Sequence, residues 1–198
     1  MTSNLANAGI FLVQAIVGIY LILMILRFLM QVSRVDYYNP LCQSIVKLTD
    51  PLVKPLKTIL PTVRGVDFAT LLVAILVQLV LICIVVALLG GPLFHPAYIA
   101  WAFVGVTATL FDVYFFALIV MVIGSFIAPY STHPAMTLVQ QLTEPLCAPA
   151  RKLLPPMGGL DFSIMLVFLS IAVLDSYLLI PPLANMLRIP PGVIPGLY

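Results

Sequence analysis

Four stretches of this chain are almost purely apolar and long enough to cross a membrane. They occupy residues 8–30, 68–89, 99–127 and 162–180. At about 1.5 Å of rise per helical residue, about 20 residues cross the roughly 30 Å of hydrocarbon in a bilayer. Only 8% of the residues are charged, against roughly 25% in an ordinary soluble domain. The sequence therefore predicts an all-α integral membrane protein with four transmembrane helices.

A proline-rich segment between the first two stretches recurs between the last two. Ten of the 21 residues from 48 to 68 are identical 94 positions later, with no gap. The chain is therefore a tandem duplication, with repeats at residues 1–93 and 94–187 and a Pro/Gly-rich tail at 188–198. Each repeat has the order span, polar segment, span, and both insert in the same orientation as parallel repeats. The repeated motif positions that we interpret as structural are Thr49, Asp50, Pro51, Pro55, Pro61 and Asp67 in the first copy, and Thr143, Glu144, Pro145, Pro149, Pro155 and Asp161 in the second.

The two polar segments, at about residues 40–60 and 134–155, have the pattern of amphipathic helices lying in the membrane interface. In the first of them, apolar residues recur at three- and four-residue intervals on one face and lysines on another, and the second repeats this layout. We interpret Thr49 or Asp50 as a helix N-cap and place Pro51 in the first turn, so each Thr-acid-Pro motif restarts a helix after a bend. The aspartate before each even-numbered span is interpreted as the N-cap of that span.

Basic residues set the predicted orientation. Eight of the nine lysines and arginines lie in the two connecting segments, if Arg27 at the end of the first span is counted. By the positive-inside rule, both segments are expected in the cytoplasm and both termini on the other side. Arg27 is interpreted as an anchor that reaches up to the headgroups. The basic face has two interpretations, contact with anionic lipid headgroups or contact with a partner protein. Its residues are Lys47, Lys54, Lys57, Arg64, Arg151 and Lys152.

Three polar residues lie deep within the spans: Gln78, Asp112 and Asp175. Counted along the helices, both acids lie about 20 Å from the cytoplasmic end, and Gln78 lies at a similar depth. Two neighbouring carboxylates in a low dielectric do not both ionise cheaply, so we expect one to be protonated and bonded to the other acid or to Gln78. The interpretations are a proton or cation pathway, or hydrogen bonds that hold the third and fourth helices together.

Enzyme and cofactor signatures are absent from the sequence. The three cysteines have no metal-ligand spacing, and His95 and His133 have no acidic or cysteine partner at ligand spacing. There is no GxSxG, no HExxH and no glycine-rich phosphate loop. The net charge of +2 is too small to indicate nucleic acid as a direct partner. We expect a non-enzymatic protein that needs no cofactor.

The duplicated unit resembles the YggT domain. In the first repeat the resemblance rests on Asn39-Pro40, on residues 48–52 and on residues 65–68, and in the second it rests most clearly on residues 142–146 and 158–162. Together the two units cover nearly the whole chain. The second unit departs from the family pattern at one position. The family usually carries an arginine at the end of the odd-numbered span, which Arg27 keeps and Met121 replaces.

The resemblance implies a bacterial inner-membrane protein or a chloroplast relative. Members are implicated in osmotic-stress tolerance and potassium uptake, in cell division and nucleoid organisation, and in plastid cytochrome maturation. Two-repeat members resemble the Gram-negative type, which favours the osmotic setting. We expect a protein that assists or organises another membrane system, with membrane lipids, a membrane protein or a second copy of itself as partners. The alternatives are ion or proton conduction by an oligomer through Asp112 and Asp175, and a cell-division or membrane-complex assembly factor.

Overall fold

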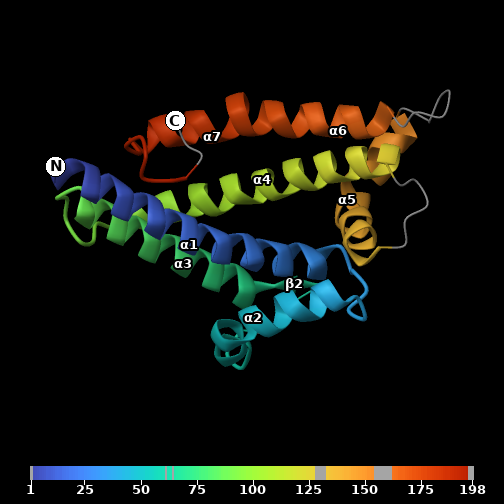
Figure 1. Cartoon of the computed structure of the whole chain (residues 1–198), viewed down its shortest axis with the longest axis horizontal. Coiled ribbons are helices and arrows are strands. Elements are labelled where there is room, and N and C mark those ends of the chain that lie inside the picture. Colours follow the sequence, from blue (N-terminus) through green and yellow to red (C-terminus); the bar gives the residue numbers. More distant parts are fainter. Residues whose placement is uncertain (1, 61, 64, 128–132, 154–161, 196–198) are drawn as a thin grey trace.

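The computed structural model of this chain describes residues 2–60, 62–63, 65–127, 133–153 and 162–195. Long helices dominate it, and three of them are α1 (Thr2–Val32), α3 (Phe68–Leu88) and α4 (Ala97–Ile127). A fourth rod is built end to end from α6 (Phe162–Val173), η1 (Leu174–Leu179) and α7 (Ile180–Met186). Two further helices lie in the polar segments, α2 (Pro40–Lys57) and α5 (Pro134–Leu153), as Figure 1 shows.

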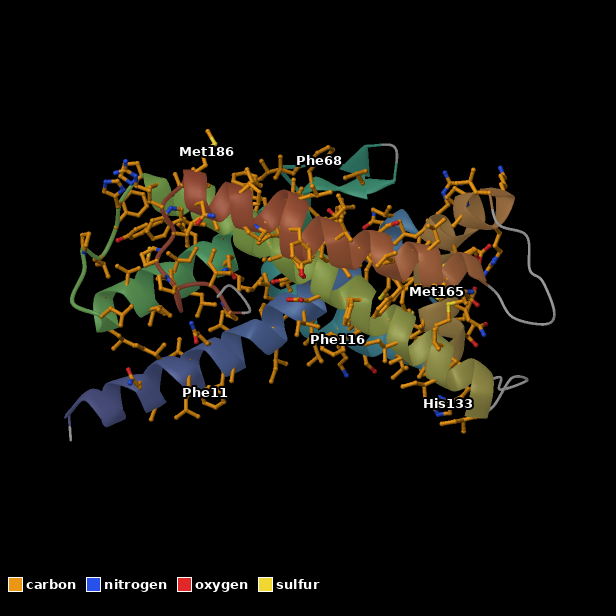
Figure 2. All side chains as sticks on the ribbon, turned by 90° about the horizontal axis from the view of Figure 1, so that it is seen from above. Phe11, Phe68, Phe116, His133, Met165 and Met186 are labelled. Atoms are coloured by element: carbon orange, nitrogen blue, oxygen red, sulfur yellow. The ribbon has the colours of Figure 1, made fainter. Side chains whose placement is uncertain are left out.

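The four rods have the length and the surface of membrane spans. The segments that suffice by length and apolarity are Asn7–Val32, Phe68–Leu88, Ala97–Gly124 and Ser163–Met186. Their outward faces carry large apolar side chains, such as Phe11, Phe116 and Met165, each at least 64% exposed (Figure 2). Such a surface suits hydrocarbon rather than water, because apolar side chains gain nothing by facing solvent. The predicted four apolar helices of a multi-pass membrane protein are confirmed.

The helices are arranged so that α4 contacts all three other rods. Helix α1 packs most extensively on α3 and also contacts α4, whereas α4 alone among these joins the first repeat to α6 and α7. Figure 1 shows both chain ends and the α3–α4 connection at one end of the rods, and α2 and α5 at the other. The layout of span, polar helix and span is therefore used twice in the same direction.

The fourth rod does not end where the sequence suggested. We expected Pro181 and Pro182 to close the span near Ile180, but the rod continues through α7 to Met186. The prolines fall in the first turn of α7, where a backbone N–H has no intrahelical partner in any case. The preceding η1 is a π-helical turn, whose wider spacing of hydrogen bonds accommodates the change of register.

The C-terminal tail folds back onto the helices. The Gln14 side-chain amide on α1 donates to the Gly192 carbonyl at 2.8 Å, and the Trp101 indole on α4 donates to the Leu187 carbonyl at 3.1 Å. Val193 and Ile194 are buried. The described part of the Pro/Gly-rich tail therefore packs on the end of the bundle where the chain also begins.

Candidate functional site

The first polar segment is one continuous helix. The side chain of Asn39 accepts a hydrogen bond from the Leu41 N–H at 2.9 Å, and Pro40 occupies the first helical position. The predicted restart at the Thr-acid-Pro motif is therefore wrong, because α2 runs through Pro51 and Pro55 without ending. An N-cap asparagine followed by proline is a recognised start signal, and this pair carried the information that the motif did not.

The second polar segment repeats this arrangement. Helix α5 also runs through both prolines of its motif, Pro145 and Pro149. After α2, a tight antiparallel pair of strands, β1 (Thr62–Val63) and β2 (Val66–Asp67), leads the chain into α3, with Gly65 at a φ of 85° in the turn. Pro61, Arg64, Pro155 and Asp161, four of the predicted motif or basic positions, lie outside the described residues.

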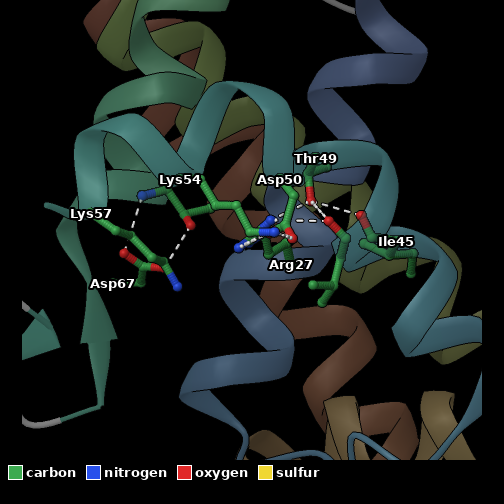
Figure 3. Close-up of polar contacts among 9 residues, drawn as sticks. Arg27, Ile45, Thr49, Asp50, Lys54, Lys57 and Asp67 are labelled. Atoms are coloured by element: carbon green, nitrogen blue, oxygen red, sulfur yellow. Dashed lines mark hydrogen bonds and ion pairs between the residues drawn. The ribbon is translucent and has the colours of Figure 1, made fainter.

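Arg27 is buried at the junction of α1 and α2. Its side chain is only 6% exposed, and its guanidinium pairs with the Asp50 carboxylate at 2.9 Å. It also donates to the Thr49 hydroxyl at 2.7 Å and to the Val46 carbonyl at 3.2 Å (Figure 3). The interpretation of Arg27 as a headgroup anchor is therefore wrong. The arginine turns inward because α2 folds back over the last turns of α1 and offers it three acceptors.

Thr49 links this arginine to the body of α2. Its side chain is fully buried, and its hydroxyl donates to the Ile45 carbonyl at 2.6 Å while accepting the bond from Arg27. A threonine hydroxyl has one donor and two acceptor sites, so both bonds are compatible. Thr49 thus acts as a bridge in the middle of the helix and not as its N-cap.

Two further ion pairs extend the contact to α3. Lys54 pairs with Asp50 one helical turn earlier, and Lys57 pairs with the fully buried Asp67, at 2.9 and 2.7 Å. Asp67 also accepts from the backbone N–H and the hydroxyl of Thr70, which confirms it as the N-cap of α3. We call these residues the Arg27 network. They are Arg27, Thr49, Asp50, Lys54, Lys57 and Asp67.

The network lowers the pKa of both of its carboxyl groups. Hydrogen bonding to Lys54, with a contribution from Arg27, holds the pKa of Asp50 below its ordinary value of 3.8 against the opposite effect of burial. For Asp67, burial is the largest effect and would raise the pKa. The ion pair with Lys57 and the bonds from Thr70 together outweigh it, so this pKa is also lowered. Both acids are therefore ionised at neutral pH and complete the charge balance of the network.

The second repeat has different contacts at the positions equivalent to Arg27, Thr49 and Asp50. Met121 lies where the first repeat has its arginine, and the Thr143 hydroxyl contacts the Met121 sulfur at 3.1 Å. Without a cation beneath it, Glu144 faces outward at 54% side-chain exposure and pairs with Arg151 at 2.9 Å. The buried network of the first repeat is thus replaced by a surface ion pair.

The two polar helices meet through hydrogen bonds. The Asn39 side-chain amide, besides capping α2, donates to the Pro134 carbonyl at the start of α5 at 2.7 Å. The Gln141 side chain on α5 accepts from the Asp36 N–H at 3.2 Å. Helices α2 and α5 are therefore joined near their N-terminal ends, and we call their exposed faces the composite surface of α2 and α5. Of the predicted basic face, Lys47, Lys54, Lys57 and Lys152 are exposed on it.

The intramembrane residues lie around a cavity of about 520 Å³. Gln78 and Asp112 line it, and Thr109 is its third polar residue. Asp175 lies in η1 of the fourth rod and is not among the described residues that line this cavity. The predicted hydrogen bond to Gln78 is wrong, because neither polar atom of its side chain has a partner among the described residues.

The cysteine and histidine side chains form no cluster with acids that would hold a metal. Among the described residues there is no group of three or more His, Cys, Asp or Glu side chains in suitable positions. The strongest chemical features of the structure are therefore the Arg27 network, the composite surface of α2 and α5, and the intramembrane cavity.

The fold defines a class of protein: an all-helical membrane protein built from two parallel copies of one unit. Comparison with known families identifies that unit, since the family CCB3/YggT matches residues 6–88 and again residues 100–182. The chain therefore belongs to this family and has two tandem domains.

Curated relatives extend over nearly the whole chain. The "Uncharacterized protein PA0392" of Pseudomonas aeruginosa is 44% identical over 189 residues, which cover 94% of this chain and 95% of the relative. The "Uncharacterized protein YggT" of Escherichia coli K12 is 32% identical over 169 residues, which cover 85% of this chain and 88% of the relative. No solved structure matches.

Proposed function

We propose that this chain is a non-enzymatic protein of the bacterial inner membrane that assists or organises another membrane system, in osmotic and potassium homeostasis. The observation that carries the proposal is the composite surface of α2 and α5. Two polar helices from separate repeats are joined at Asn39 and Pro134 and together present lysines and apolar side chains. A surface of this kind, built twice and fixed in place, is suited to docking rather than to catalysis.

The exposed side of α2 supports a position at the membrane surface. Leu48 and Leu52 are 58% and 46% exposed, and Lys47 is exposed beside them. Apolar side chains at the boundary of the acyl region, with lysines reaching the headgroups, are typical of a helix in the interface. Under the positive-inside rule this surface is cytoplasmic. Anionic lipids then contribute about 1 kcal/mol for each lysine near the membrane surface.

Site-specific photocrosslinking in living bacteria tests the proposal. A photoreactive residue replaces Leu48 on α2 or Lys152 on α5, and the matched control replaces Phe94, which is 56% exposed at the opposite end of the bundle. In a strain lacking its own member of the family, we expect discrete adducts with another membrane protein from the first two positions and none from the third. Adducts with lipid alone would contradict a docking role.

The identity of the crosslinked protein distinguishes a role in osmotic and potassium homeostasis from a role in cell division or complex assembly. A potassium-uptake or osmotic system supports the proposal, and the adducts should increase under hyperosmotic or potassium-limited growth. A division or assembly complex would instead favour the role of assembly factor.

Thiol labelling tests the orientation on which the proposal depends. With the native cysteines replaced by alanine, single cysteines at Lys54 and Arg151 should be shielded from an impermeant reagent applied outside the cell. A cysteine at His95 should react. The reverse pattern would place the composite surface outside and remove the proposed partner.

Ion or proton conduction by an oligomer is the second candidate, and the presence of Asp112 and Asp175 within the spans favours it, because ionisable residues at such depth mark ion and proton pathways. Purified protein in liposomes decides between the two. Potassium or proton flux above that of empty vesicles, lost in Asp112→Asn or Asp175→Asn, would establish conduction. Flux equal to that of empty vesicles is the result expected for a docking protein.

A further inference from the structure

The intramembrane cavity has the size and lining of a small-molecule site. Its volume of about 520 Å³ lies within the roughly 300–1,000 Å³ of ordinary ligand pockets. Most of its wall is apolar and comes from α1, α4 and α5, and Pro195 of the folded-back tail also lines it. Gln78, Thr109 and Asp112 are its three polar residues. A few polar groups in an apolar wall fix the orientation of a ligand.

Gln78 is a buried amide with unused hydrogen-bonding capacity. Its side chain belongs to a residue that is 1% exposed, and neither Nε2 nor Oε1 has a partner among the described residues. Leaving such groups unpaired is destabilising, because they give up hydrogen bonds to water on burial and gain none in the protein. Gly105 on α4 allows this placement, because a Cβ at that position would overlap the Gln78 amide. The structure therefore keeps room for an amide that the chain itself does not satisfy.

Asp112 supplies a carboxyl group without a cation. It is exposed toward the cavity from the middle of α4, and no Lys, Arg or His is among the described residues that line this space. Within the described chain, none of the ion pairs includes Asp112. An uncompensated carboxylate at this depth is costly, so a cation entering the cavity is favoured.

We propose that this cavity binds a single-chain amphiphilic amine. The ammonium group donates hydrogen bonds to the Asp112 carboxylate and to the Gln78 Oε1 atom, and the alkyl chain lies along Leu21, Leu138 and their apolar neighbours. Charge-assisted bonds of this kind are about twice as strong as neutral ones. The site does not depend on a partner at α2 and α5, so it goes beyond the docking role.

A second apolar space shows what selects the head group. A groove of about 640 Å³ between α1 and α3, closed by Leu52 and Leu56 of α2, has no carboxylate or amide in its wall. It fits an acyl chain, and the Tyr20 hydroxyl is the one polar side-chain group among the described residues that line it, so it offers no charge to select a cationic head group. Discrimination between amines and other amphiphiles therefore belongs to the cavity that contains Asp112.

Binding of octylamine, octanol and octanoate to the protein in nanodiscs tests the proposal. The three probes share one tail and differ only in the head group, and empty nanodiscs measure partition into lipid. We expect saturable octylamine binding with an affinity about tenfold above that for octanol, equivalent to about 1.4 kcal/mol, and weaker binding still of octanoate. Equal binding of all three probes would overturn the proposal and leave an apolar lipid groove.

Variants separate the head-group contacts from the space itself. Asp112→Asn should remove the preference for octylamine over octanol. Gln78→Leu should weaken the binding of both of these probes. Asp175→Asn, at an acid outside the lining, should keep the preference. An amine preference that survives in Asp112→Asn would contradict the site.

A glycine pair provides the matched steric control. Both Gly18 and Gly9 lie on α1 with open space where a side chain would go, but only Gly18 lines the cavity. Gly18→Leu should abolish octylamine binding while the protein still elutes as a folded species, and Gly9→Leu should leave binding unchanged. Equal effects of the two would exclude the cavity as the site. Cysteine crosslinks between two copies at Phe116, with no amine binding, would identify the space as a dimer interface instead.

Discussion

The two repeats use the same motif around different residues at the end of the odd-numbered span. In the first, Arg27 bonds the Thr49 hydroxyl and pairs with Asp50, so the acidic residue of the motif is held against the bundle. In the second, Met121 meets the Thr143 hydroxyl and the acid turns outward. One position on a neighbouring helix thus decides whether the acid of the motif serves as a buried partner or as a surface charge.

The two repeats also differ in how extensively their two spans pack on each other. Helix α1 packs more extensively on α3 than α4 packs on α6 and α7 together. The first repeat also ties its second span to its polar helix through the Lys57–Asp67 pair. Local opening requires less free energy where contact density is low, so the second repeat is the half that should open first.

Replacing Arg27 by methionine, the residue at the equivalent position of the second repeat, should cause the largest loss of unfolding free energy. Arg27→Met removes the cation from beneath Asp50 and Thr49, and breaking a buried ion pair typically costs about 3–5 kcal/mol. We expect a loss of about 3 kcal/mol of unfolding free energy, at the lower end of this range, because Asp50 keeps its ion pair with Lys54. Unfolding by SDS in mixed micelles measures it.

Met121→Leu is the control for this substitution. It changes the equivalent position of the second repeat between two apolar residues of similar volume, so it should cost less than about 1.5 kcal/mol. If the two substitutions cost the same, the Arg27 network does not distinguish the repeats.

Asp67→Asn should cause the next largest loss of unfolding free energy, and this loss should depend on pH. The amide still caps α3 but loses the ion pair with Lys57, a charge-assisted contact of about 2 kcal/mol. Because the folded pKa of Asp67 lies below its ordinary value of 3.8, the stabilisation is complete above that value and is lost as the pH falls through the folded pKa.

The gap in unfolding free energy between wild type and Asp67→Asn should therefore be constant from pH 7 to about pH 5 and should narrow below about pH 4. Stability curves in the same micelles at several pH values measure it. A gap that widens in acid would reverse the assigned direction of the pKa shift.

The two motif threonines provide a matched pair with a smaller effect. Thr49→Val removes the hydroxyl that accepts from Arg27, and a bond to a charged group contributes about 1.5–3 kcal/mol. Thr143→Val removes a hydroxyl bonded to a thioether sulfur, a weak acceptor, so we expect less than about 1 kcal/mol. Equal losses of unfolding free energy would show that the arginine adds nothing to the threonine contact.

The smallest effect should come from Glu144→Gln. The Glu144–Arg151 pair is on the surface, with side-chain exposures of 54% and 33%, and such pairs contribute about 0.2–1 kcal/mol. The loss should disappear in high salt, because exposed charges are screened. Asp50→Asn is the comparison in the first repeat and should cost more and depend less on salt, since Asp50 is 21% exposed. A salt-independent loss for Glu144→Gln would mean that this acid has a buried role as well.

The sequence located most of the site residues but assigned several of them the wrong partners. Arg27 at the end of an apolar stretch indicates a headgroup anchor, because nothing local offers it an acceptor. Its three acceptors lie 19, 22 and 23 positions later, and they come within reach only once α2 folds back over α1. In the same way, Pro51 suggested a helix start, although Asn39 already provides the cap and the helix continues through the proline.

Depth along the membrane was easier to predict than direction around a helix. Counting residues placed Gln78, Asp112 and Asp175 at similar levels, and Gln78 and Asp112 line the same cavity. The count gave no information about which side of each helix faces which neighbour. The packing of α3 on α4 places the Gln78 amide against Gly105, and neither of its polar atoms has a partner among the described residues.

By itself, the sequence determined four membrane-spanning helices, two parallel repeats and the family. The length of an apolar stretch and a duplicated motif are properties of the chain alone, since hydrocarbon thickness and helical rise are constants. The tertiary structure decided which Thr-acid-Pro motif holds a buried arginine, how the two polar helices join, and where an unsatisfied amide and an unpaired acid share a cavity. Those outcomes depend on contacts between residues far apart in sequence, because short-range burial and hydrogen bonding fix the partner of each polar group only after the helices have packed.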